Sequence, residues 1–103
     1  EIVALHVYET PSGAVGAYLD EEMVRAGFEM ARTRMVEKLA EHPEVQAVLK
    51  KGHSYRTIVD YSTEIKADCI VIGSHKPGLR DYFLGSTAAR VVRHAPCAVH
   101  VTR

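Results

Sequence analysis

The feature that most constrains the fold of this chain is a strand–loop–helix–strand pattern in residues 67–103. The apolar run 69–72 (CIVI) is short, β-branched and followed by Gly73, which predicts a strand buried on both faces. A helix is predicted from Ser86 until Pro96 stops it, with Ala88, Val91, Val92 and Ala95 on one face. Residues 98–101 predict another strand. The first loop spans residues 74–84, whereas such loops usually have about 2–6 residues. We therefore expect this loop to bind a ligand.

The residues at the two ends of this loop favour an anion such as a phosphate. Gly85 has no Cβ, so a bulky group can approach its backbone. Ser86 and Thr87 stand at the predicted helix start, where free N–H groups and the positive end of the dipole attract anions. Gly73 lies at the carboxyl end of a predicted parallel strand, where ligands commonly bind. Lys76 in the loop adds positive charge. From spacing alone, an ordinary strand exit at Gly73 and an ordinary helix cap at Gly85 remain an open alternative.

The same stretch resembles the ATP-binding branch of the universal stress proteins. Gly73-Ser74-His75 and Gly85-Ser86 match the two ends of the family's phosphate-binding pattern. The chain has Lys76 where the usual pattern has Gly, and eight residues lie between Lys76 and Gly85, one fewer than usual. The run Ser-His-Lys-Pro is similar to the Ser-His-Arg-Pro of one subgroup of the family. The resemblance covers nearly the whole chain and is strong over residues 52–103.

The resemblance implies an α/β fold: an open, mostly parallel, twisted sheet with helices on both faces. Residues 1–103 then form a single domain. In the family the strand order is 3-2-1-4-5, and members usually begin one strand and one helix before the position of Glu1. We therefore expect an N-terminally incomplete domain that lacks its central strand.

The resemblance also implies a nucleotide site. Val7 would contact the adenine, Ile72 would lie beside it, and Gly73 would border the ribose. The residues expected around the phosphates come from both ends of the loop: Ser74, His75, Lys76, Gly85, Ser86, Thr87 and Ala88. From the residues alone, His75 could equally hold the loop by an internal hydrogen bond. The ligand would be ATP, with AMP or ADP as alternatives.

The function implied by the resemblance is that of a cytoplasmic stress-response regulator whose bound ATP changes the surface offered to partners. The outer strand, residues 97–101, would pair across a two-fold axis in a homodimer. Asp81 is the only acid within the loop and is a weak candidate for holding Mg²⁺, so at most slow hydrolysis is expected and no catalytic residue is assigned. A nucleotide-free dimerising module and a weak ATP hydrolase are the alternatives.

Composition and motifs exclude several other classes. Thirteen basic and thirteen acidic residues cancel, so no net charge attracts nucleic acid or membranes. No apolar run approaches the roughly 18 residues of a membrane span. The six histidines show no metal-ligand spacing, and both cysteines are expected to be free, buried thiols. Walker, Rossmann and nucleophile-elbow motifs are absent.

The first half of the chain predicts a strand, a helix, a strand and another helix. The opening strand is residues 1–7, and residues 9–19 form a loop that could cover the site or simply connect. A helix capped by Asp20 follows, and its core-facing stripe is expected to be Val24, Phe28, Ala31, Met35 and Leu39. Its three methionines are expected to pack in the core. Residues 45–49 predict a strand, and Ser54 begins a helix with Ile58, Ser62 and Ile65 on one face.

Overall fold

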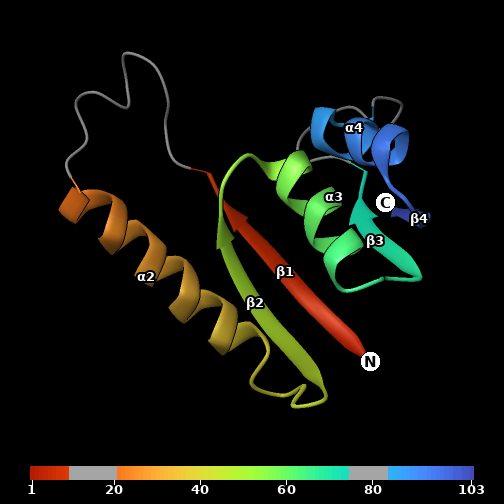
Figure 1. Ribbon diagram of the computed structural model, residues 1–103. Helices are drawn as coiled ribbons and strands as arrows, with labels where there is room; N and C mark the ends of the chain where they lie inside the picture. The colour runs from red at the N-terminus through yellow and green to blue at the C-terminus, as the bar shows by residue number, and fades with distance from the viewer. Residues whose placement is uncertain (10–20, 75–83) are drawn as a thin grey trace. The chain divides into compact units, whose positions relative to one another are not determined.

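The computed structural model describes residues 1–9, 21–74 and 84–103 (Figure 1). The chain divides into two compact units, residues 1–53 and 54–103, and each is considered by itself. The first unit contains β1 (Ile2–Tyr8), α2 (Glu21–Lys38) and β2 (Val45–Lys51). The second contains α3 (Ser54–Glu64), β3 (Cys69–Gly73), α4 (Ser86–His94) and β4 (Ala98–Thr102).

Each unit is built on one pair of parallel strands, which confirms the α/β fold class. In the first unit β1 pairs with β2, so that Ile2 lies opposite Val45 and Tyr8 opposite Lys51. In the second unit β3 pairs with β4, and the register runs from Cys69 opposite Ala98 to Gly73 opposite Thr102. Parallel neighbours need a crossover connection, and α2 and α4 provide it in the two units.

Helix α2 lies along the β1–β2 pair (Figure 1), and an aromatic cluster joins the strand ends to it. The ring of Tyr8 meets Phe28 edge to face, with 6.1 Å between the ring centroids. The Lys51 ammonium lies 4.7 Å from the centroid of the Phe28 ring, close enough for a cation–π attraction. A Cβ on Gly27 would clash with the Tyr8 hydroxyl, so the glycine makes room for this cluster.

The predicted stripe of α2 is confirmed as its more protected face, although the helix has no fully buried residue. Val24, Phe28, Ala31, Met35 and Leu39 are all half-buried. The prediction that all three methionines pack inside is wrong. Met23 and Met30 are 56% and 57% exposed, because they fall outside the stripe that faces the strands.

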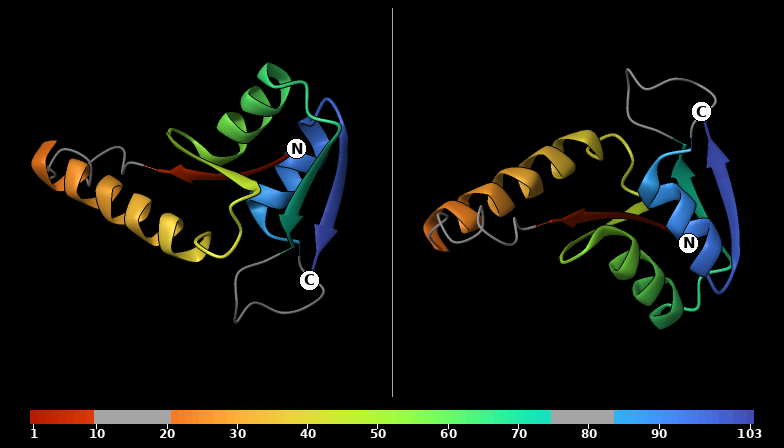
Figure 2. Two further views of the ribbon diagram at one scale, coloured as in Figure 1. Left: turned by 90° about the horizontal axis from the view of Figure 1, so that it is seen from below. Right: turned by 90° about the horizontal axis from the view of Figure 1, so that it is seen from above.

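The core of the second unit lies under α4. Val91 is completely inaccessible to solvent and Ala88 is 3% exposed. Helix α4 lies beside the β3–β4 pair in both views of Figure 2 and contacts β4, while α3 packs against α4. From α3, Ser62 is 5% exposed, and its hydroxyl donates a hydrogen bond to the Val59 carbonyl at 2.7 Å.

Two aromatic rings also join α3 to α4. The ring of Tyr55 on α3 lies 5.6 Å from that of His94 on α4, measured between centroids. The Arg90 guanidinium carbon lies 5.3 Å from the centroid of the Tyr55 ring. A hydrogen bond with Tyr55 raises the pKa of the Arg56 guanidinium above its usual value, so this side chain remains a cation.

Burial in the second unit differs from the sequence prediction in three places. The first apolar run is not buried on both faces, because exposure alternates along β3 and Val71 is 68% exposed. Within the unit, α4 covers one face of the strand pair, which leaves the alternate positions open. Val92 on α4 is 47% exposed, and Ile65 follows the end of α3 and is 42% exposed. The cysteines are free as predicted, but Cys69 is exposed rather than buried.

None of the helices in the described ranges is both long and apolar enough to cross a bilayer. The longest of them, α2, has 18 residues. It carries eight charged side chains: Glu21, Glu22, Arg25, Glu29, Arg32, Arg34, Glu37 and, at its last position, Lys38.

Candidate functional site

The two ends of the long connection between β3 and α4 meet at the carboxyl ends of the strands. The Gly85 N–H donates a hydrogen bond to the Ser74 carbonyl at 2.6 Å. The Ser74 N–H in turn donates to the Thr102 carbonyl at the end of β4, at 2.7 Å. The strand exit and the helix start are therefore held together by backbone hydrogen bonds.

Gly73 is not explained by local packing or by backbone conformation. No described atom lies within 4 Å of the position that a Cβ on Gly73 would take. Among the described glycines only Gly52 has a positive φ, so Gly73 does not need the conformational freedom of glycine. Gly85 has φ −59° and ψ 153°, which any L-residue can adopt. These positions can therefore carry a side chain without backbone strain, and at Gly73 that side chain would meet none of the described atoms.

The start of α4 has hydrogen-bond donors available for an anion. Gly85 occupies the N-cap position, and none of the described side chains caps the helix there. The first intrahelical bond runs from the Ala89 N–H to the Gly85 carbonyl, at 2.9 Å. The N–H groups before Ala89 have no intrahelical acceptor. Ser86 is exposed and Thr87 is half-buried, so their hydroxyls and amides are the accessible donors, whereas Ala88 is mostly packed inside.

The remaining predicted site residues are placed as follows. Ile72 is half-buried in β3, and its carbonyl accepts a hydrogen bond from the Thr102 hydroxyl at 3.5 Å. Val7 is half-buried in β1, where it lies opposite Lys50, and it belongs to the first unit. His75, Lys76 and Asp81 lie outside the described residues.

Thr102 is a site residue that the sequence analysis missed. Its carbonyl fixes the Ser74 amide, and its hydroxyl bonds to Ile72, so both groups position the strand end that precedes the loop. The available signal was a threonine directly after the apolar run of residues 98–101, at the carboxyl end of a predicted parallel strand.

The described part of the chain offers no cluster of three histidine, cysteine or acidic side chains that could hold a metal ion. The donors at this site are instead backbone N–H groups and hydroxyls. Such donors bind oxyanions, and a polyanion that reached both Gly73 and the start of α4 would meet them along its length.

Comparison with protein families gives one match over the whole chain. Residues 1–103 match the model of the universal stress protein family. A universal stress protein from Methanothermobacter thermautotrophicus is 31% identical over 112 residues, covering 100% of this chain and 76% of the relative. Universal stress protein G of Salmonella typhimurium is 45% identical over 51 residues, which are 48% of this chain and 36% of that protein.

Comparison with solved structures gives the same fold. Universal stress protein UspA from Lactobacillus plantarum superposes with a TM-score of 0.80 at 26% identity, covering 98% of this chain and 76% of that one. The hypothetical protein MJ0577 gives a TM-score of 0.83 at 24% identity, covering 99% of this chain and 74% of that one.

Proposed function

Because this chain belongs to the universal stress protein family, whose members serve the stress response, we propose that it is an ATP-binding regulator. The phosphates would contact the backbone of Gly73 at the exit of β3 and the N–H groups of Ser86 and Thr87 at the start of α4. The N–H groups of Ser74 and Gly85 already donate to backbone carbonyls and hold the two loop ends together. Binding of ATP would change the surface that the protein offers to its partners. AMP or ADP would use the same donors with fewer contacts.

The observation that carries this proposal is a glycine with no described neighbour at its Cβ position, beside a helix start that no described side chain caps. No described atom lies within 4 Å of the Cβ position of Gly73, and its backbone conformation does not require glycine. The Gly85–Ser74 hydrogen bond holds the helix start next to that strand end. An approaching oxyanion would meet the backbone without a Cβ in its way. The helix dipole and the free N–H groups would then stabilise its charge.

The test is a titration of the full chain with ATP and with adenosine, after any bound nucleotide has been removed by unfolding and refolding. Charge-assisted hydrogen bonds to the phosphates should make ATP bind at least about tenfold more tightly than adenosine. Calorimetry measures both affinities. Equal affinities would contradict phosphate binding at the loop ends. Absence of binding by either ligand would favour a nucleotide-free interaction module.

We further propose that the protein forms a homodimer through β4. Among the described residues β4 pairs only with β3, so its other edge has unpaired backbone groups. The Thr102 carbonyl points toward β3, because it accepts a hydrogen bond from the Ser74 N–H at the end of that strand. Backbone groups alternate in direction along a strand, so the N–H and C=O of Val99 and Val101 point to the outer edge. An isologous contact between two such edges would pair these groups and protect them from unwanted partners.

A Val101→Pro substitution should weaken this dimer at least about tenfold, because proline removes a donor on the outer edge and leaves the β3–β4 hydrogen bonds in place. Val101→Ala is the matched control, since it shortens the same half-buried side chain and keeps the N–H. Analytical ultracentrifugation measures both dissociation constants. If the alanine variant dissociates as readily as the proline variant, the dimer does not depend on pairing at this edge.

A further inference from the structure

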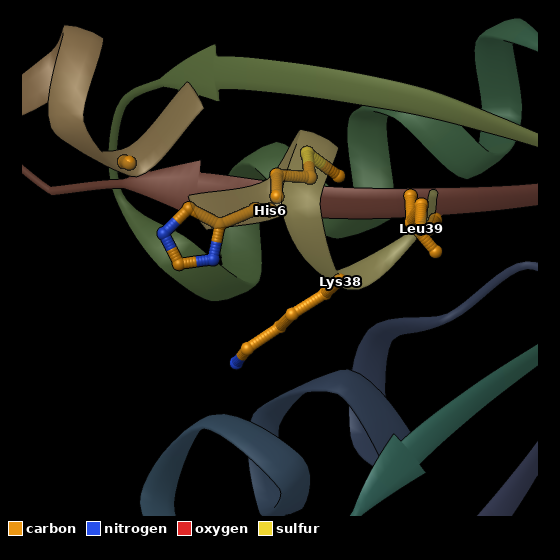
Figure 3. A pocket seen from close by; sticks show the side chains of 6 residues that line it. His6, Lys38 and Leu39 are labelled. Atoms are coloured by element: carbon orange, nitrogen blue, oxygen red, sulfur yellow. The ribbon is translucent and has the colours of Figure 1, made fainter. Parts of the chain in front are cut away.

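A pocket of about 220 Å³ lies between β1 and α2, entirely within the first unit (Figure 3). Its walls are Ala4 and His6 from β1, and Ala31, Met35, Lys38 and Leu39 from α2 or just after it. The pocket belongs to a different unit from the ends of the long loop, so the proposed phosphate site does not account for it.

We propose that this pocket binds a small organic monocarboxylate that has a compact apolar body, such as an aromatic or branched aliphatic acid. Four of its six lining residues are apolar: Ala4, Ala31, Met35 and Leu39. The other two, Lys38 and His6, offer nitrogen donors. An apolar body can therefore enter while a carboxylate remains near a cation.

The size of the pocket limits the ligand. An engineered apolar cavity of about 150 Å³ can hold a benzene molecule, whereas drug-sized ligands occupy about 300–1,000 Å³. The pocket therefore accommodates about one ring with a small substituent. A nucleotide would be too large, and a free phosphate has no apolar body to fill the space between the apolar walls.

The polar groups define the charge of the ligand. In the described part of the chain, neither Lys38 nor His6 makes a hydrogen bond or an ion pair. In Figure 3 the Lys38 side chain and the His6 ring extend to the same side of the view, and Leu39 lies toward the other. A carboxylate would pair with the ammonium and could also accept a hydrogen bond from the imidazole N–H.

A different reason for a lysine at this position is the helix dipole. Lys38 is the basic residue in the last turn of α2, where positive charge stabilises a helix. That role would make Lys38 matter for stability and would give no dependence on a carboxylate. The two roles are separated by a ligand titration.

The experiment is an NMR titration of the full chain with three probes: benzoate, benzyl alcohol and inorganic phosphate. Benzoate should give saturable shifts of the amides of Ala4, His6, Ala31 and Met35, and it should bind at least about tenfold more tightly than benzyl alcohol. Phosphate should leave these amides unchanged. If benzoate produces no saturable shift, or if benzyl alcohol binds equally well, the proposal is wrong.

Three variants complete the test. Lys38→Gln should weaken benzoate binding about tenfold, and Arg34→Gln, an exposed change on the same helix outside the pocket, should not. Ala31→Leu should abolish binding by filling the space, with a thermal midpoint at least as high as that of the unmodified chain. Equal losses in the Lys38 and Arg34 variants would indicate unspecific attraction and overturn the assignment. If the leucine variant does not fold, the glutamine pair still decides the question.

Discussion

A Val91→Asp substitution is expected to remove most of the folding free energy of the second unit. Val91 is completely inaccessible to solvent at the centre of α4. Burying a carboxylate there without a partner costs about 3–5 kcal/mol, in addition to the lost apolar contacts. The whole folding free energy of a chain of this length is about 5–15 kcal/mol. Urea unfolding followed by far-UV circular dichroism measures the loss.

The next residue on the same helix provides the control. Val92 is 47% exposed, so an aspartate there stays in contact with water. Val92→Asp should cost only about 1 kcal/mol, from lower helix propensity and from a negative charge near the end of the helix. Equal losses at the two positions would show that the helix does not bury Val91 in solution, and that the described core is incorrect.

The sequence allowed the loop ends to be predicted because their signals are local. A β-branched run that ends in Gly73 marks a strand exit, and Gly85-Ser86 before an apolar helical stripe marks a helix start. Because the two strands pair in parallel, their carboxyl ends lie at the same edge of the sheet, and the loop begins there. The structure confirms that Gly85 and Ser74 meet there.

Burial was predicted less well, because it depends on what covers each face. The run CIVI is equally apolar at every position, yet Val71 is exposed and Ile70 is half-buried, since α4 covers one face of the strand pair in this unit. The spacing of apolar residues cannot predict which face of a strand is exposed when the residues on both faces are apolar. In the helix the same limit applies to Val92, which adjoins the buried Val91 in the sequence.

Side-chain roles that arise from distant pairing could not be predicted either. Thr102 supports the candidate site only because β4 ends beside β3, which places its carbonyl against the Ser74 amide. The pocket of the first unit likewise requires His6 on β1 to face Lys38 on α2, across 31 intervening residues of sequence. No spacing motif joins such residues, so only the three-dimensional arrangement identifies them.

A Gly85→Asp substitution is expected to lower ATP affinity about 100-fold and leave the fold intact. The backbone of Gly85 has φ −59° and ψ 153°, and no side chain in the described ranges caps α4. Aspartate is a preferred N-cap residue, so its carboxylate should accept hydrogen bonds from the N–H groups of the first turn. These hydrogen bonds should maintain or raise the stability of the helix. The same carboxylate would occupy the anion site and repel the phosphates, and like charges about 4 Å apart are strongly unfavourable near a protein surface.

Gly85→Ser is the matched control, because serine is also a good N-cap but carries no charge. It should weaken ATP binding by about tenfold or less, since its hydroxyl competes for the same N–H groups without repelling the ligand. Calorimetry gives both affinities, and thermal unfolding shows whether each variant retains the stability of the helix. Should the aspartate variant bind ATP as tightly as the serine variant, the phosphates do not approach the start of α4. In that case the glycine at position 73 needs another explanation.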